Sequence, residues 1–276
     1  MTRESGPLRP LRPGSRRLWL TWAASLSAGL SAGLLTARSA DAQTLLSSVI
    51  ASLKPSVLPV GTFSATASPR FGFRGSGFVV GDGTLVATNH HVLPEGAELD
   101  SGPQMAVMVV KNAESGEVRR ARVVASNRSR DLALLKIEGT ALTPLMLDTP
   151  GAALEGQSIA LMGFPLGGTF GFSAVTHKGI ISSITSVALP AATAQQLDPR
   201  AVMRLREGNF EVLQLDAIAY PGNSGGPVFD TETGKVVAIL NMVFVKGSRE
   251  SALSNPTGIS YAIPVRHLGE MLSALR

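Results

Sequence analysis

A serine within a glycine-rich turn is the strongest chemical signal in the sequence. The segment Pro221-Gly222-Asn223-Ser224-Gly225-Gly226-Pro227 surrounds one hydroxyl with turn residues. A serine nucleophile needs a sharp turn that exposes its hydroxyl and directs its own N–H into the same space. Gly222 offers a second N–H where a side chain would obstruct the backbone. Gly222 and Ser224 are therefore candidate oxyanion donors, each contributing roughly 3–4 kcal/mol.

A serine nucleophile also needs a general base, and the chain contains four histidines: His90, His91, His177 and His267. His267 falls in a predicted C-terminal helix and His177 lies before a predicted strand, so surface or packing roles are expected for both. His90 and His91 sit at the end of a predicted strand, where adjacent side chains point to opposite faces. We therefore expect no shared metal site and only one of this pair in a cleft. The residue types alone do not decide which.

The third requirement is a carboxylate that holds the imidazole in one tautomer. Asp131 directly precedes the apolar run Leu132 to Ile137, which would anchor it. Asp82, Asp100 and Asp148 stand in polar or Pro/Gly-rich surroundings typical of turns. Asp131 is therefore the candidate orienting residue.

Short apolar runs separated by turn residues predict an all-β body after residue 43. The predicted strands cover residues 77–80, 85–88, 105–111, 122–125, 132–137, 158–162, 178–184, 212–216, 236–243 and 259–263. Helical spacing predicts a short N-terminal helix ending at Lys54-Pro55 and a final helix over 265–276. A short helix from Asp198 to Gly208 is expected inside the long segment Leu189 to Phe210. That segment is either a surface excursion or a regulatory loop.

The charge distribution argues against nucleic-acid binding. The formal net charge is +5, but six arginines lie in the first 42 residues, and beyond them 19 basic residues face 18 acidic ones. This leaves no basic field with interleaved aromatic residues. The absence of cysteine excludes disulfides, thiol nucleophiles and cysteine-type zinc sites. A serine mechanism requires no metal and no organic cofactor.

Residues 1–42 have the order of an export signal. A polar segment ending in Ser15-Arg16-Arg17 precedes the apolar run Leu18 to Leu35 and the small-residue site Ala40-Asp41-Ala42. We expect cleavage after Ala42 and a periplasmic or secreted protein. The paired arginines also resemble a twin-arginine signal. The alternative is an uncleaved anchor, which would bring a membrane into contact with the protein.

Several of these segments resemble the HtrA/Deg branch of the trypsin-like serine proteases. The chain order His, Asp, Ser, with separations of 40 and 93 residues, is that of the trypsin-like group. The segments that are similar to HtrA/Deg motifs are Gly75-Ser76-Gly77-Phe78-Val79, Thr88-Asn89-His90-His91-Val92, Asp131 to Lys136, Ala160 to Gly167, Gly222 to Gly226 and Tyr261-Ala262-Ile263-Pro264. The likeness spans about residues 45–265. It selects His91 over His90.

The resemblance implies two six-stranded antiparallel β-barrels of the chymotrypsin type, with a cleft between them. The protease domain would occupy residues 43–276, with an N-barrel over about 55–150 and a C-barrel over about 151–264. The first barrel would carry His91 and Asp131, and the second Ser224. Only twelve residues follow Pro264, so we expect the protease domain alone, without the PDZ domain of many HtrA proteases. Asn223, where zymogen-type relatives have Asp, argues against activation by propeptide cleavage.

The same resemblance implies a substrate pocket and a class of substrate. Ile218 would form the pocket floor, with Asn241, Met242 and Val243 as one wall, so we expect cleavage after small or medium aliphatic residues. Unfolded or damaged polypeptides of the bacterial cell envelope are the expected substrates.

The sequence leaves open three alternative functions and the oligomeric state. The alternatives are a catalytically silent holdase, a membrane-anchored protease with one specific substrate, and a non-enzymatic β-barrel adaptor. HtrA relatives often form trimers, so a homotrimer is also considered. Phe71 and Phe73 are candidate contacts for it, with core packing as the other reading.

Overall fold

The structure is a computed structural model that describes residues 45–94, 104–112, 116–165, 167, 171–186, 211–241 and 258–275. The export signal and the whole segment Leu189 to Phe210, with the helix predicted from Asp198 to Gly208, lie outside the described residues. From Ser47 onwards the chain forms one compact unit. None of the helices among the described residues is long and apolar enough to cross a bilayer.

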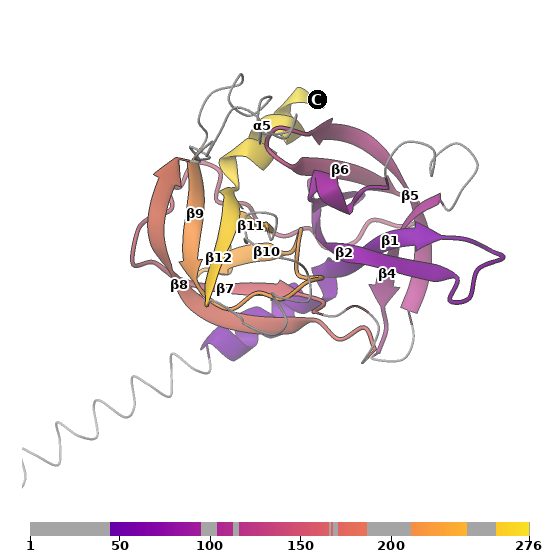
Figure 1. Cartoon of the computed structure of the whole chain (residues 1–276), viewed down its shortest axis with the longest axis horizontal. Helices are drawn as coiled ribbons and strands as arrows, with labels where there is room; N and C mark the ends of the chain where they lie inside the picture. The colour runs from indigo at the N-terminus through magenta and orange to yellow at the C-terminus, as the bar shows by residue number, and fades with distance from the viewer. Residues whose placement is uncertain are drawn as a thin grey trace, which may run out of the picture. The chain divides into compact units, whose positions relative to one another are not determined.

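The first half of this unit is a closed six-stranded barrel. Its strands are β1 (Val57–Phe63), β2 (Phe71–Val80), β3 (Leu85–Thr88), β4 (Gln104–Val110), β5 (Gly116–Asn127) and β6 (Leu132–Ile137). They follow the order β1-β2-β3-β6-β5-β4, and β1 pairs with β4 to close the ring. Every pairing is antiparallel. Figure 1 shows this barrel in indigo to magenta.

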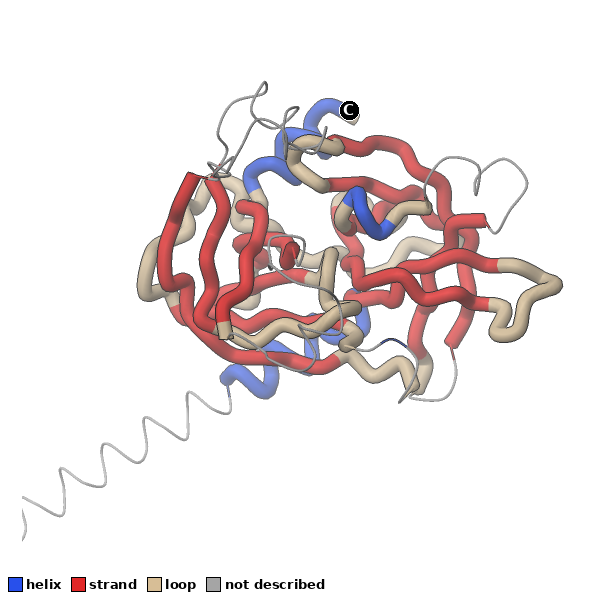
Figure 2. Tube along the Cα trace, viewed as in Figure 1, coloured by secondary structure: helices blue, strands red, loops and turns tan. Residues whose placement is uncertain are grey.

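The second half repeats the architecture. Its strands are β7 (Ser158–Gly163), β8 (Val175–Ser186), β9 (Glu211–Asp216), β10 (Pro227–Asp230), β11 (Val236–Asn241) and β12 (Ile259–Pro264). Their order is β10-β11-β12-β9-β8-β7, closed by the pairing of β10 with β7. The prediction of two six-stranded antiparallel barrels is confirmed. The tube in Figure 2 shows the strands of both barrels in red, with short helices outside them.

Each barrel has its own apolar interior. Leu58, Val86 and Leu135 are fully buried in the first, and Leu161, Leu213 and Leu240 in the second. Burial of a side chain of this size contributes roughly 1.5–3 kcal/mol relative to exposure. These cores hold the strand ends in place, and the site is built on the connections between them.

The helical segments named next, all within the described residues, lie outside the barrels. Residues 45–53 are helical and continue into η1 (Lys54–Ser56), as the Lys54-Pro55 stop predicts. α5 (Arg266–Ala274) follows β12 and buries Leu268. The third segment corrects the sequence reading: His90 and His91 lie in the short 3-10 helix η2 (His90–Val92), after β3 rather than on a strand.

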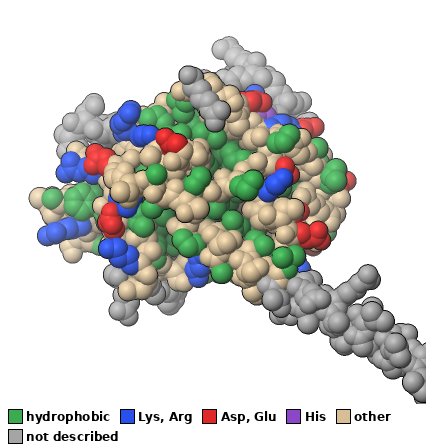
Figure 3. Space-filling model, turned by 180° about the vertical axis from the view of Figure 1, so that it is seen from behind, with side chains coloured by type: hydrophobic (Ala, Val, Ile, Leu, Met, Phe, Trp, Pro, Cys, Tyr) green, Lys and Arg blue, Asp and Glu red, His purple; other side chains and the backbone are tan. Residues whose placement is uncertain are grey.

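Charges on the molecular surface are mixed where one face is visible. On the face shown in Figure 3, lysine and arginine side chains stand among aspartates and glutamates, and hydrophobic side chains occupy the middle. No single basic field covers this face. The view is in keeping with the near-balance of charge beyond residue 42.

Candidate active site

His91 and Asp131 form a hydrogen-bonded pair. The Nδ1 atom of His91 lies 2.7 Å from Oδ2 of Asp131, and the backbone N–H of His91 donates to Oδ1 at 2.8 Å. Both side chains are partly exposed, at 29% and 18%. Because one carboxylate accepts from the ring and from the backbone of the same residue, the ring orientation is fixed. With its Nδ1 proton directed to the carboxylate, the neutral ring presents Nε2 as an acceptor.

The backbone around Asp131 is also fully engaged. Its carbonyl accepts hydrogen bonds from the N–H of His90 at 3.1 Å and from the side-chain amide of Asn89 at 3.0 Å. Among the described residues it is the one non-glycine residue with a positive φ, 53°. Aspartate tolerates this left-handed conformation better than most residues. It turns the chain into β6 and places the carboxylate against His91.

Asn241 supplies a contact that sequence reasoning missed. This residue ends β11, is 1% exposed, and its Nδ2 donates to Oδ2 of Asp131 at 2.9 Å. The sequence placed Asn241 in a pocket wall. The structure directs its amide to the carboxylate, which thereby accepts three hydrogen bonds. No local signal could reveal this contact, because the partners are 110 residues apart and belong to different barrels.

Ser224 stands between β9 and β10 in two consecutive β-turns. The N–H of Asn223 donates to the carbonyl of Tyr220 at 3.0 Å, and that of Gly226 to the carbonyl of Asn223 at 2.9 Å. Gly222 and Gly225, the third residues of the two turns, have φ values of 102° and 84°. A positive φ at this position is typical of a type II turn and favours glycine. Ser224 is therefore the second residue of a tight turn.

Two backbone donors of these turns are open. In the part of the chain that the structure describes, neither the N–H of Gly222 nor that of Ser224 donates a hydrogen bond. By contrast, the N–H of Gly225 donates to the carbonyl of Leu240 at 2.9 Å. Two unused N–H groups on either side of Asn223 are the arrangement expected of an oxyanion-binding turn.

The turn with Ser224 packs directly against the first barrel. The N–H of Ser76, on β2, donates to the carbonyl of Ser224 at 2.8 Å. A Cβ atom on Gly225 would lie 2.2 Å from the Ser76 carbonyl oxygen and 2.4 Å from Oγ1 of Thr88, which ends β3. The serine turn and the loop that carries His91 are therefore neighbours, although they come from different barrels.

Asn223 is an unusual buried residue. It is 0% exposed, and among the described residues its Oδ1 and Nδ2 atoms have no hydrogen-bond partner. Burial of an unpaired polar group costs about 1–3 kcal/mol. We therefore expect the Asn223 side chain to lower the stability of the fold.

His177 packs beneath the same turn. It lies within β8, rather than before a strand, and its ring centroid is 5.6 Å from that of Tyr220, the first residue of the turn. Burial lowers the pKa of His177. The ring is therefore kept neutral to a lower pH than a free imidazole.

The remaining predicted site residues are only partly described. Ile218, the expected pocket floor, is 41% exposed and follows β9. Met242 and Val243 lie outside the described residues. Phe71 is 7% exposed and packs edge-on against Phe172 with ring centroids 5.7 Å apart.

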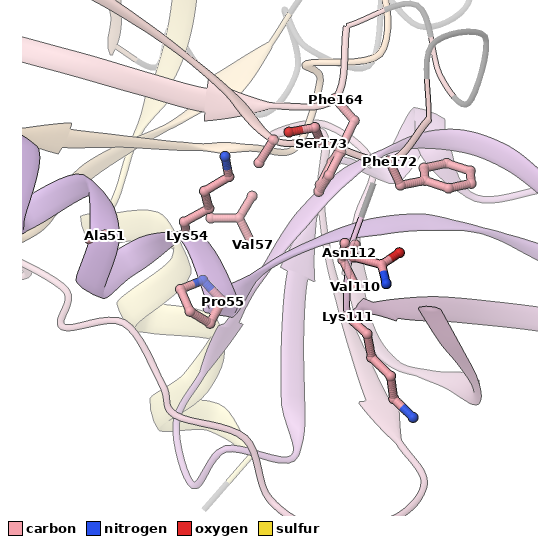
Figure 4. Close-up of a pocket in the computed structure, with 11 residues that line it drawn as sticks. Ala51, Lys54, Pro55, Val57, Val110, Lys111, Asn112, Phe164, Phe172 and Ser173 are labelled. Atoms are coloured by element: carbon pink, nitrogen blue, oxygen red, sulfur yellow. The ribbon is translucent and has the colours of Figure 1, made fainter. Parts of the chain in front are cut away.

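Phe172 also lines a pocket of about 380 Å³. Figure 4 shows it between the N-terminal helical segment, the end of β4 and the connection from β7 to β8. Lys54 and Phe164 are among its lining residues, and none of the candidate catalytic residues is. Within the described ranges, no group of three His, Asp or Glu side chains is placed to bind a metal ion.

The geometry agrees with the outcome of comparisons with known proteins. The sequence profile of the trypsin-like peptidase domain matches residues 75–239, which include His91, Asp131 and Ser224. The chain belongs to the trypsin-like peptidase family. The chain spans about a third of the length of the curated relatives it matches.

Two of these relatives are named probable periplasmic serine endoprotease DegP-like. The protein from Pseudomonas fluorescens is 29% identical over 191 residues, which cover 69% of this chain and 32% of the relative. The protein from Marinomonas is 30% identical over 205 residues, covering 73% and 36%. The resemblance to the HtrA/Deg branch is thereby confirmed.

Solved structures share the fold of this chain. The serine endoprotease from Yersinia pestis has a TM-score of 0.57 at 24% identity and covers 83% of this chain and 66% of its own. The HtrA-type protease AlgW with a tripeptide has a TM-score of 0.60 at 23% identity, covering 83% and 63%. At these identities the likeness concerns the fold alone.

Proposed function

We propose that the chain is a serine endopeptidase in which His91, Asp131 and Ser224 form the catalytic triad. The proposal is carried by three parts that lie on neighbouring segments at the barrel junction. They are a histidine hydrogen-bonded to a carboxylate at 2.7 Å, a serine in a tight turn, and two open N–H groups on that turn. Membership of the trypsin-like peptidase family supports the same assignment.

The proposed reaction begins with attack of the Ser224 hydroxyl on the carbonyl carbon of a peptide bond. Nε2 of His91 takes the hydroxyl proton, and Asp131 stabilises the imidazolium that forms. The N–H groups of Gly222 and Ser224 hold the negative oxygen of the tetrahedral intermediate. His91 then gives its proton to the leaving amine. Water, activated by the same ring, releases the acyl group from Ser224.

The substrate and the location are proposed from the relatives. Two of them are named periplasmic serine endoproteases, which supports a role in the cell envelope for a chain that begins with an export-like segment. We propose unfolded or damaged polypeptides as substrates. An apolar Ile218 at the pocket floor would favour cleavage after Val, Ala, Leu or Ile, because it offers no charge to Lys or Arg.

The test is hydrolysis of casein by the purified full chain, beside its Ser224→Ala variant. The wild-type protein is expected to cleave casein and to react with an active-site phosphonate. Ser224→Ala is expected to lose at least about 10⁴-fold in rate, as triad removal does in other serine proteases. Mapping of the cleaved bonds then tests the preference for aliphatic residues.

Two outcomes would count against the proposal. Equal activity in both proteins would remove Ser224 from the mechanism. Absence of both cleavage and phosphonate labelling in the wild-type protein, together with protection of unfolded casein from aggregation, would favour a holdase instead.

A further inference from the structure

The Ser76 hydroxyl connects the two barrels at the candidate oxyanion turn. Ser76 lies on β2 and is 0% exposed. Its Oγ donates to the carbonyl of Gly222 at 2.7 Å and accepts the N–H of Phe164 at 3.0 Å. We propose that Ser76 is a positioning residue, which holds the Gly222 turn where its N–H can meet the oxyanion. This inference rests on the proposed peptidase function.

The hydroxyl is presented from a rigid support. The backbone N–H of Ser76 donates to the carbonyl of Ser224, and its own carbonyl accepts from Oγ1 of Thr88 at 2.8 Å. The same residue therefore contacts the nucleophile residue, the end of the strand that leads to His91, and the oxyanion turn. Because every polar group of Ser76 is engaged, its hydroxyl has one defined direction.

On the turn side, the hydroxyl completes the anchoring of one peptide unit. The peptide between Gly222 and Asn223 is held by its N–H, which donates to Tyr220, and by its carbonyl, which accepts from Ser76. Gly222 adopts a φ of 102°, where glycine has more freedom than any other residue. Without the second anchor, only the bond to Tyr220 would define how this carbonyl is oriented. The position of the preceding N–H, a candidate oxyanion donor, would then be less well fixed.

On the other side, the hydroxyl is held by Phe164, which directly follows β7. Phe164 is 2% exposed, and Figure 4 shows its side chain at the wall of the neighbouring pocket. Its N–H reaches Ser76, so the hydroxyl is bound between a well-packed residue and the turn. Oxyanion stabilisation depends on donors that need no reorganisation at the moment of reaction. Because Phe164 is well packed, its hydrogen bond to Ser76 holds the hydroxyl, and with it the Gly222 turn, in place before the reaction begins.

The experiment compares Ser76→Ala and Ser76→Cys with Ser56→Ala. Ser56 is a matched control, because it is 1% exposed and its Oγ donates to the carbonyl of Thr143 at 2.7 Å, across 87 residues. Ser76→Cys keeps the packing volume with a weak donor. The readouts on the full chain are kcat and KM for a peptide that the wild type cleaves, the affinity for a matched peptide aldehyde, and the melting temperature.

We expect both Ser76 variants to lose about 10- to 100-fold in kcat, with KM within about threefold of wild type. This loss is smaller than the 10²–10³-fold cost of deleting an oxyanion donor outright. The affinity for the aldehyde, whose hemiacetal oxygen mimics the oxyanion, should fall by the same factor as kcat. Ser56→Ala should lower the melting temperature but leave kcat within twofold.

Three results would overturn the inference. The first is an unchanged kcat in a folded Ser76→Ala or Ser76→Cys variant, while wild type is active. The second is a loss of kcat in Ser56→Ala equal to that in Ser76→Ala, which would point to general stability. The third is a wild type without peptidase activity, which would refute the proposed function itself and so remain distinguishable from the first two.

Discussion

In the first barrel the carboxylate of Asp131 accepts three hydrogen bonds. In the second barrel the buried side chain of Asn223 pairs with none of the described residues. The contrast extends to the backbone, since the carbonyl of Asp131 accepts twice while the N–H groups of Gly222 and Ser224 donate to nothing described. The Asp131 carboxylate is thus oriented by completed hydrogen bonds, one of which comes from Asn241 of the second barrel. In the second barrel, two backbone donors and the Asn223 side chain have no partner among the described residues, and we propose that the two donors serve a substrate.

The largest expected effect on kcat comes from substitution of Asp131, whose carboxylate is hydrogen-bonded. Asp131→Asn should lower kcat by about 10⁴-fold, because an amide favours the wrong tautomer of a catalytic histidine in such a triad. Asp82→Asn is the matched control: Asp82 is an exposed turn residue of the same barrel, whose Oδ1 accepts the N–H of Thr84 at 2.9 Å. It should remain within twofold of wild type. Steady-state kinetics on a peptide substrate measure both, and equal losses in the two variants would contradict the role of Asp131.

The second prediction sets Asn223 against Asn89, since both are 0% exposed. Asn89 donates to the carbonyl of Asp131 through Nδ2, while its Oδ1 has no partner among the described residues, so Asn89→Ala should lower the free energy of unfolding by about 1 kcal/mol. Asn223→Ala removes two unpaired polar atoms and leaves a small cavity, so it should raise that free energy by about 1 kcal/mol. Urea denaturation measures both values. Equal destabilisation would show that the Asn223 amide is satisfied after all.

The smallest effect concerns His177 and acid. Burial lowers its pKa, so the unfolded chain binds the proton more readily than the folded one. The stability linked to this residue is present above the ordinary histidine pKa of about 6.5 and is lost as the pH falls. His177→Phe keeps a ring beside Tyr220 and should therefore show a smaller drop in melting temperature between pH 7.5 and pH 5. An identical drop in both proteins would mean that His177 contributes nothing to the acid sensitivity.

Some strands could not be predicted because their local sequences contradict the rule for strands. β1 contains Pro59 and Gly61, and both residues are usually read as breaks in a strand. β10, Pro227–Asp230, has only four residues and begins with proline directly after the serine turn. Both strands are held by pairing with neighbouring strands in closed barrels. A local sequence pattern carries no information about this pairing. Apolar runs such as Leu132 to Ile137 were recognisable because their own composition favours a buried strand.

The residues of the candidate site also divide into those that have a local sequence signature and those that have none. The turn around Ser224 could be read from its glycines, because positive φ values and close packing leave a sequence signature. His90 and His91 could not be separated by residue type, and only the family resemblance selected His91. The contacts of Asn241 and Ser76 depend on how the barrels dock. They join residues 110 and 146 positions apart, so neither could be predicted locally.

The hydrogen bonds from Ser76 to Gly222 and Ser224 also bear on the order in which the parts of the site assemble. Contacts between residues so far apart in sequence form late, because the entropy of closing a long loop must be overcome first. During synthesis the first barrel leaves the ribosome with His91 and Asp131 long before the segment around Ser224 exists. A nascent or truncated chain therefore carries the base without the nucleophile, and the proposed triad is assembled only after the second barrel has emerged.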